Sequence, residues 1–319
     1  MALTAVHLIN PMRNPAGGSE HRTLSLFELL AHEGEVNIWS EEPPHPSFAG
    51  LAPIKHIGPN SRFPQGGVLV FIGTYFSIGS WIQMANPARM ILVHNLDQPE
   101  RLRSVYSVLG RATGRPVEIV YASSKIAAQT PDLPGRVEAS PIAIDSFSCS
   151  RHTDRFVVGR LSRDVPEKHH PEDPALYESL IEDGISVKVM GGTTLSREVE
   201  ELNVLPENAV SAPDFLCSLD CFVYRTHPAW LEAFGRVIPE AMASSLAIVA
   251  EPRHGYAEIL RHGHDVLFAS TTSEFQDAIV RLRDDVELRR RLGANARQTV
   301  EKLYGPEYAR SISAFYYSG

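Results

Sequence analysis

The sequence predicts an α/β protein built from two parallel-sheet domains, and three observations lead to this prediction. Short runs of branched apolar residues alternate with stretches of helical periodicity, which is the order of elements in a parallel sheet. The chain has 319 residues, which is long for one domain and suits two of about 150 each. Because 43% of the residues are hydrophobic, each domain can bury its own core.

The first half of the chain contains apolar runs that predict strands at 3–9, 36–39, 53–57, 68–73, 90–95 and 117–123. Helical periodicity follows the first run and returns at 78–84 and 99–115. Gly17 and Gly18 lie between the first strand and its helix, an arrangement that directs backbone N–H groups and a helix N-terminus at a phosphate. The loop matches neither G-x-G-x-x-G nor G-x-x-x-x-G-K-[ST], so a plain turn is the alternative.

A polar segment at 145–154 lacks periodicity, so we expect a domain boundary near Ser150. The second half repeats the alternation, with a strand in RFVVGRLS and further strands at 186–192, 221–227, 247–250 and 265–269. Its expected helices are at 174–183, 215–219, 273–284, 286–304 and 306–317. We therefore expect domains at 1–150 and 151–303, followed by a C-terminal helix within 304–319.

Residues 231–260 predict a loop, a short helix, a buried strand, a second glycine-bearing loop and another helix start. Glu232 and Glu240 stand eight positions apart across a Phe-Gly pair, whose glycine permits a tight backbone. We expect Glu232 on the loop and Glu240 inside the helix, with both carboxylates at the carboxyl end of a strand. Open parallel sheets bind their ligands there. Acids are also common in first helical turns that have no function.

This segment resembles the retaining glycosyltransferases of family 4, whose wording is close to E-x-F-G-x-x-x-x-E-A-M-A. The matching residues are Glu232, Phe234, Gly235, Glu240, Ala241, Met242 and Ala243, and AIVA follows them. The resemblance implies a GT-B fold, in which two Rossmann-like domains face a cleft. It also implies metal-independent transfer of a hexose from a nucleotide donor, with the acceptor on domain 1–150, the donor on 151–303, and the last helix crossing back to the first domain.

The same resemblance assigns roles to individual residues. Glu232 would hold hydroxyls of the transferred sugar, and Glu240 would receive the ribose hydroxyls. Arg160, in Gly159-Arg-Leu-Ser, and Lys168 would neutralise the departing diphosphate, because a leaving anion needs fixed cations. The alternative for both cations is solvent exposure without function.

His94, in LVHNLD, would lie near the donor sugar, and a structural histidine is the alternative. The remaining donor-binding residues implied are Gly17, Gly18, Gly159, Gly191, Phe234, Gly235, Glu240, His254 and Gly255.

The sequence departs from the family in three places. Ile142-Ala143 replaces an Asn-Gly near the hinge, and Ser245-Leu246-Ala247 replaces a G-x-P, which we expect to alter only a turn. Arg253-His254 precedes Gly255 where relatives have a glycine pair, so Gly255 alone would provide the closest backbone approach, and Arg253 and His254 would adjust donor choice.

The composition excludes some functions. A formal charge of −8 argues against nucleic-acid binding. Cys149, Cys217 and Cys221 have no histidine at a zinc-finger spacing, so we expect buried or inert thiols and no metal site. No basic start precedes the first apolar run, and no stretch approaches the ~20 apolar residues of a spanning helix, so we expect a cytoplasmic protein.

The predicted helix at 99–115 is amphipathic and basic, with arginines at 101, 103, 111 and 115. Such a helix suits weak peripheral contact with an anionic membrane or acceptor. A surface helix packed on its own sheet is the alternative.

The resemblance implies no cofactor beyond the substrate, which would be a UDP- or GDP-linked sugar transferred to an unknown acceptor hydroxyl. The product would be a bacterial glycan, a glycolipid or a small-molecule glycoside. Two other functions stay open: an inactive nucleotide-sugar-binding homologue, and a nucleotide-sugar epimerase, which shares the two-domain architecture.

Overall fold

The computed structural model describes residues 5–58, 62–149 and 155–318, and the chain divides into two compact units. The N-terminal unit comprises Met1–Pro141 together with Gly305–Gly319, and the C-terminal unit comprises Ile142–Tyr304. The boundary expected at Ser150 lies outside the described residues, whereas the division by contacts falls after Pro141.

The N-terminal unit is built on a seven-stranded parallel sheet with the order β3-β2-β1-β4-β5-β6-β7. Its strands are β1 (Val6–Ile9), β2 (Val36–Ser40), β3 (Ile54–His56), β4 (Val68–Ile72), β5 (Arg89–His94), β6 (Glu118–Tyr121) and β7 (Arg136–Val137). Strand order reverses between β1 and β4, so the loops that follow these strands flank a topological switch point, where α/β sheets bind ligands.

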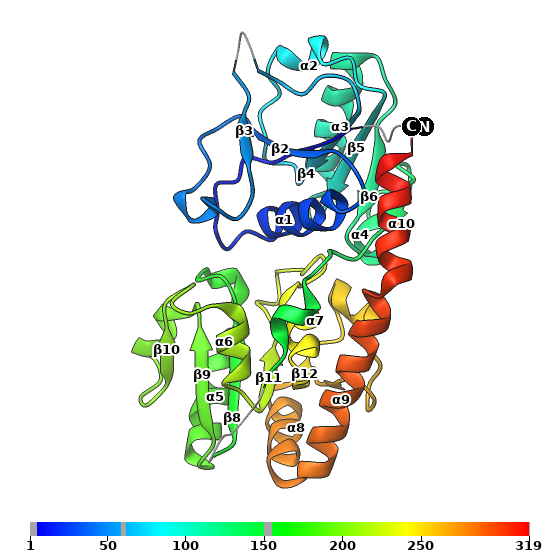
Figure 1. Cartoon of the computed structure of the whole chain (residues 1–319). Helices are drawn as coiled ribbons and strands as arrows, with labels where there is room; N and C mark the ends of the chain where they lie inside the picture. Colours follow the sequence, from blue (N-terminus) through cyan, green and yellow to red (C-terminus); the bar gives the residue numbers. More distant parts are fainter. Residues whose placement is uncertain (1–4, 59–61, 150–154, 319) are drawn as a thin grey trace. The chain divides into compact units, whose positions relative to one another are not determined.

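The helices of this unit include a segment from the far end of the chain. They are α1 (Gly18–Ala31), α2 (Trp81–Met84), α3 (Pro99–Thr113), α4 (Ser124–Ala127) and α10 (Pro306–Tyr317), with a 3-10 turn η1 (Pro46–Phe48). Figure 1 shows α10, in red, lying along the N-terminal unit. The Tyr317 hydroxyl donates to the Leu30 carbonyl, and Tyr316 donates to the Glu138 carboxylate, which also pairs with Arg22 at 2.9 Å. The last helix is therefore part of this unit's core.

The C-terminal unit has a six-stranded parallel sheet with the order β10-β9-β8-β11-β12-β13. Its strands are β8 (Val157–Leu161), β9 (Ser186–Met190), β10 (Asn203–Leu205), β11 (Cys221–Tyr224), β12 (Ala247–Ala250) and β13 (Leu267–Phe268). Its helices are α5 (Asp173–Glu182), α6 (Ala212–Cys217), α7 (Val237–Ala243), α8 (Thr272–Asp284) and α9 (Val286–Leu303). Short 3-10 turns are η2 (Ile144–Phe147), η3 (Pro166–Lys168), η4 (Thr193–Arg197) and η5 (Gly255–Ile259). The predicted α/β class with two parallel sheets is confirmed.

Individual residues explain how α8 begins and how α9 packs against the turn before β12. A capping box of Thr271 and Glu274 starts α8, so two backbone N–H groups at the helix end are bonded. Ser245, which replaces the family's glycine in the turn before β12, adopts a left-handed φ of 52°. A Cβ at Gly293 would lie 2.3 Å from the Ser245 carbonyl oxygen, so only glycine lets α9 approach this turn.

Two of the three cysteines are joined, which corrects the expectation of inert thiols. Cys149 forms a disulfide with Cys217 across 68 residues of sequence, and it ties the segment after η2 to the end of α6. Cys221 is free and buried, and burial raises the pKa of its thiol. The sequence contains three thiols but no signal that selects a pair.

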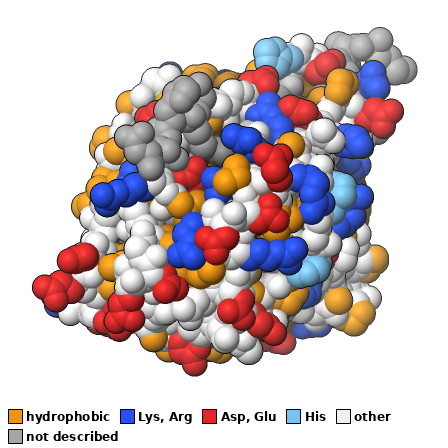
Figure 2. All heavy atoms as spheres, turned by 90° about the horizontal axis from the view of Figure 1, so that it is seen from below, with side chains coloured by type: hydrophobic (Ala, Val, Ile, Leu, Met, Phe, Trp, Pro, Cys, Tyr) orange, Lys and Arg blue, Asp and Glu red, His pale blue; other side chains and the backbone are white. Residues whose placement is uncertain are grey.

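Within residues 5–58, 62–149 and 155–318, no group of histidine, cysteine or acidic residues could hold a metal ion, and no helix is long and apolar enough to span a bilayer. On the face drawn in Figure 2, acidic and basic side chains are interspersed rather than gathered into one basic field.

Candidate active site

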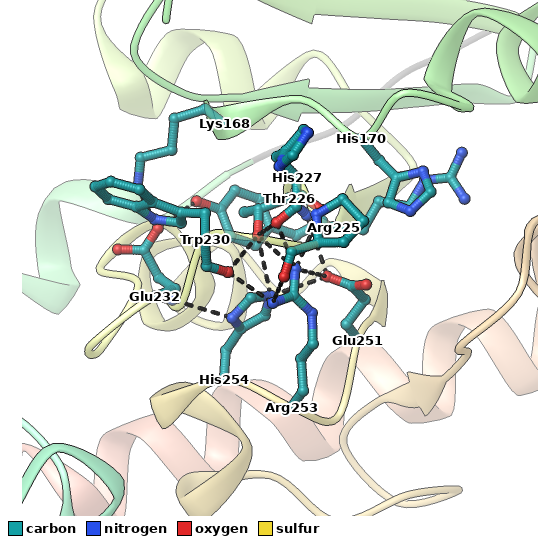
Figure 3. Close-up of polar contacts among 12 residues, drawn as sticks. Lys168, His170, Arg225, Thr226, His227, Trp230, Glu232, Glu251, Arg253 and His254 are labelled. Carbon is teal, nitrogen blue, oxygen red and sulfur yellow. Dashed lines mark hydrogen bonds and ion pairs between the residues drawn. The ribbon is translucent and has the colours of Figure 1, made fainter. Parts of the chain in front are cut away.

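Glu232 lies in the loop between β11 and α7, at the carboxyl edge of the C-terminal sheet. Its carboxylate pairs with the Lys168 ammonium and accepts a 3.0 Å hydrogen bond from the Tyr224 hydroxyl. Burial favours the neutral acid, but the ammonium and the hydroxyl outweigh it and lower the pKa of Glu232 to about 2. Figure 3 shows Lys168 reaching past Trp230 towards this carboxylate. The site therefore holds a carboxylate that is ionised at neutral pH.

Gly235 shapes the backbone beside that carboxylate. Its φ is +74°, which other residues rarely adopt. A Cβ at this position would lie 2.7 Å from the Tyr256 ring and 3.0 Å from Glu232 Cγ. The neighbouring Phe234 is buried in the unit. Only glycine therefore fits between the Tyr256 ring and Glu232 at this position.

Arg160 lies on β8 and is directed into the interior, with 1% of the residue exposed. Its guanidinium is 3.5 Å from the Asp173 carboxylate, and its Nη1 donates to the Arg225 carbonyl. Arg225 Nε donates to the same Asp173 at 2.6 Å. Arg160 also lies 5.1 Å from the centre of the Tyr224 ring. Arg160 is therefore buried in an ion-pair network beside Tyr224, and its expected contact with the diphosphate stays a prediction.

Arg163 is a cation that the sequence analysis missed. It follows β8 by two residues and is only partly buried. Burial lowers the pKa of Lys168, the Glu232 carboxylate opposes that shift, and the positive charges of Arg163 and Arg160 add to it. An arginine directly after Gly-Arg-Leu-Ser was the available signal. Arg163 is therefore a second candidate, beside Lys168, for contact with an anionic ligand.

Glu240 occupies the first turn of α7, where Arg236 Nη2 lies 3.6 Å from its Oε1. Burial raises the pKa of Glu240, and the Arg236 charge opposes that shift. The carboxyl group therefore lies in a weakly hydrated position suited to hydrogen bonding with hydroxyl groups.

His254, which was expected near the donor, points into the protein interior. Its imidazole is fully buried, and Nδ1 accepts a hydrogen bond from the Glu232 backbone N–H at 3.1 Å. The Gly255 N–H donates to the Glu232 carbonyl at 2.9 Å. The Gly255 amide is therefore engaged by the chain itself and is not open to a donor phosphate.

Gly159 and Gly191 keep neighbouring strands close together. A Cβ at Gly159 would lie 2.4 Å from Leu219, inside the core. Gly191 has a φ of +83°, and its Cβ would lie 1.8 Å from the Ser162 carbonyl oxygen. Its own carbonyl is 2.8 Å from His169 Nε2. Gly159 lies in the middle of β8, and Gly191 directly follows β9.

Three predicted residues belong to the N-terminal unit. His94 ends β5 and is buried, and burial lowers its pKa to about 4. Within the described chain, neither of its ring nitrogens has a hydrogen-bond partner. Gly17 caps α1 and Gly18 begins it. A Cβ on Gly17 would lie 2.0 Å from Glu20 Oε2, so the chain's own carboxylate lies at the helix end where a phosphate was expected.

Part of the C-terminal unit matches a known family in sequence. Residues 195–299 match the model of the family described as Glycosyl transferases group 1. This stretch contains Tyr224, Glu232, Glu240 and the loop of His254. No protein with a curated description matches the chain in sequence.

Solved structures share the fold over almost the whole length of the chain. Alr3699/HepE of Anabaena, solved in complex with UDP and glucose, is 16% identical with a TM-score of 0.76 over 98% of each chain. A glycosyltransferase from Rickettsia africae is 13% identical with a TM-score of 0.76, and sucrose-phosphate synthase from Thermosynechococcus elongatus is 16% identical with a TM-score of 0.74. Each of these two also aligns over 98% of both chains. At this identity the likeness shows the fold alone, and the fold is the predicted GT-B type.

Proposed function

We propose that this chain is a retaining glycosyltransferase that moves a hexose from a UDP- or GDP-linked donor to an acceptor hydroxyl. The family match and the shared fold support glycosyl transfer from a nucleotide sugar. The observation that carries the proposal is the arrangement of Glu232, Lys168 and Tyr224 at the carboxyl edge of β11. A carboxylate held ionised beside a buried ammonium can orient sugar hydroxyls while a cation faces the departing anion.

The proposed reaction needs one bond to break and one to form. The bond between the anomeric carbon and the phosphate oxygen breaks, and its electron pair leaves with the nucleoside diphosphate. The acceptor oxygen bonds to the same face of that carbon, and its proton passes to the departing phosphate oxygen. Glu232 holds the sugar hydroxyls, Glu240 receives the ribose hydroxyls, and Lys168 with Arg163 stabilises the developing diphosphate charge. No pair of glycosidase-type carboxylates takes part.

The first test is nucleotide release from UDP-glucose and GDP-mannose with a panel of hydroxyl acceptors. We expect acceptor-dependent release of UDP or GDP, and NMR coupling constants that show the same anomeric configuration in product and donor. A product of inverted configuration would refute retention, and isomerised sugar from donor alone would identify an epimerase instead.

A second candidate function is a nucleotide-sugar-binding homologue without turnover. Three observations favour it: Glu20 fills the helix end at Gly17, the Gly255 amide bonds to Glu232, and Arg160 is buried. Calorimetry that shows UDP or GDP binding, with no release from any acceptor in the panel, would select this function over transfer.

Two features of the cellular setting are also proposed. Weak contact of α3 with an anionic membrane surface is supported by its arginines, although Arg103 already pairs with Asp132 and Arg101 bonds to the Thr74 carbonyl. We propose that the product is a bacterial glycan, a glycolipid or a small-molecule glycoside. A cytoplasmic location stays a prediction, and the Cys149–Cys217 bond weighs against it because disulfides persist chiefly in oxidising compartments.

A further inference from the structure

The segment that follows β12 carries three charged or polar side chains, and two of them stand where the resembling family has a glycine pair. Glu251, Arg253 and His254 all turn towards the loop between β11 and α7, the loop that holds Glu232 (Figure 3). The network includes Thr226 at the start of that loop: its backbone N–H donates to Glu251 Oε2 at 3.1 Å, and its hydroxyl is 2.9 Å from Arg253 Nη2.

His254 is held in one tautomer by its two neighbours. Its Nδ1 accepts the backbone N–H of Glu232, so the ring proton belongs on Nε2. Nε2 lies 2.9 Å from Glu251 Oε2, a carboxylate that can accept that proton's hydrogen bond. Burial acts to raise the pKa of Glu251, but the bonds from His254 and Arg253 outweigh it and lower that pKa to about 2. A neutral imidazole therefore connects an ionised carboxylate to the Glu232 backbone.

Arg253 donates hydrogen bonds to backbone carbonyl groups of the loop between β11 and α7. Its Nη1 donates to the Trp230 carbonyl at 2.6 Å, and its Nη2 donates to the His227 carbonyl at 2.9 Å and to the Thr226 carbonyl at 3.1 Å. One guanidinium thus bonds to carbonyls on both sides of the loop's turn. Because its planar nitrogens point in fixed directions, the guanidinium permits few alternative loop conformations.

Glu232 is consequently held through both of its backbone polar groups, the N–H and the carbonyl. Its N–H bonds to His254, and its carbonyl accepts from the Gly255 N–H at 2.9 Å. We propose that Glu251 and His254 are positioning residues, which set the backbone of Glu232 so that its carboxylate meets Lys168. Side chains here provide the fixed loop geometry, so His254 acts through Glu232 and contacts no substrate. The catalytic consequence rests on the proposed transfer function, whereas the contact itself does not.

Replacement of His254 by asparagine or leucine separates positioning from simple packing. Asparagine places an amide oxygen near the position of Nδ1 and can still accept the Glu232 N–H, whereas leucine fills the space without an acceptor. We expect His254→Leu to lower kcat on the order of 10²-fold, as misplacement of a reacting group by about 1 Å does. His254→Asn should recover most of that loss, and UDP affinity should stay unchanged in both. His56→Asn, at an exposed position on β3, is the matched control.

A wild-type kcat in His254→Leu would overturn the proposal, and so would an equal loss in both variants. Two measurements on the folded protein need no turnover. Nitrogen-15 imidazole shifts, assigned by the signal missing from His254→Asn, should show the Nε2–H tautomer in the wild type. Amide exchange at Glu232 should be faster in His254→Leu than in His254→Asn. If His254→Leu does not fold, wild-type protection at Glu232 in the asparagine variant replaces that comparison. An Nδ1–H tautomer, or unprotected Glu232 in wild type, would refute the contact whether or not transfer is found.

Discussion

Lys168 and Glu232 form an ion pair in which only 8% of the lysine side chain and 15% of the glutamate side chain are exposed. Each charge is stable there because the other is present, since an unpaired ion in a buried position is poorly solvated. We predict that Lys168→Met and Glu232→Gln each lower the unfolding free energy by about 3–5 kcal/mol. The double variant should lose less than the sum of the two, as measured by urea denaturation at neutral pH.

The exposed pair of Arg290 and Glu287, with side chains 73% and 84% exposed, provides the control. Because water solvates both groups, Arg290→Met should leave the urea midpoint unchanged. Additive losses in the Lys168 and Glu232 cycle would show that the two buried groups are independent, contrary to the structure.

The same pair should make stability depend on acid. The pKa of Glu232 falls from an ordinary 4.5 to about 2, so the folded protein holds this proton less tightly than the unfolded chain. The stabilisation is therefore present above about pH 4.5 and is lost as the pH falls towards 2. The difference in unfolding free energy between wild type and Glu232→Gln should shrink over that interval. A constant difference would contradict the low pKa.

Glu232→Ala should reduce transfer by at least about 10²-fold, the scale of losing one preorganised electrostatic contact. Product formation per folded enzyme, below the unfolding transition of the variant, is the measurement. The comparison variant is Glu258→Ala, which removes another acidic side chain, located in η5. Near-normal transfer by Glu232→Ala would remove Glu232 from the mechanism.

Arg160 and Arg163 should behave differently because one is buried in an ion-pair network and the other is partly exposed. Arg160→Ala should destabilise the fold, since it leaves Asp173 with one cationic partner fewer. Arg163→Ala should weaken UDP or GDP binding while the melting temperature stays the same. Calorimetry and thermal unfolding of both variants, with Arg111→Ala on α3 as control, separate these effects. Unchanged nucleotide affinity in Arg163→Ala would exclude it from the diphosphate site.

The sequence predicted the buried central strands of both sheets from their apolar runs, because burial on both faces of a parallel sheet demands such runs. It missed β7 and β10, which are edge strands of two and three residues, whereas the equally short edge strands β3 and β13 lie within the predicted runs at 53–57 and 265–269. The Glu232 loop was predictable because its chemistry is local: the Phe-Gly step, the helix and the next strand are consecutive in the chain.

The non-local features of the site could not be predicted in this way. Asp173 forms ion pairs with both Arg160 and Arg225 because α5, β8 and the residue after β11 converge, and no periodicity encodes that meeting. His254 looked like a ligand-facing substitution in a glycine loop, but the fold turns its ring towards the backbone of Glu232. Spacing identified which residues were unusual, and packing decided what they contact.

The disulfide gives a prediction that is independent of catalysis. Thiol titration of the unfolded chain without reductant should find one thiol, that of Cys221, and reduction should raise the count to three. Reduction should also lower the unfolding free energy by about 2–4 kcal/mol, because the open chain gains conformational freedom. Cys149→Ser/Cys217→Ser should be insensitive to reductant. Three thiols before reduction, in protein purified without reductant, would mean that the bond does not form.

His94 should remain neutral throughout the physiological range, because burial lowers its pKa from 6.5 to about 4 and the nearby Asp97 only partly opposes the shift. The unfolded chain then binds a proton below about pH 6.5 that the folded protein refuses, so stability falls as the pH decreases from 6.5 to 4. His94→Gln should flatten this part of the unfolding profile, and His56→Gln, at an exposed position, should not. The ring proton shift of His94 in NMR spectra should stay constant above about pH 5.5, since it titrates only near its own pKa. A midpoint near 6.5 would place His94 in contact with water, at odds with a buried ring at the end of β5.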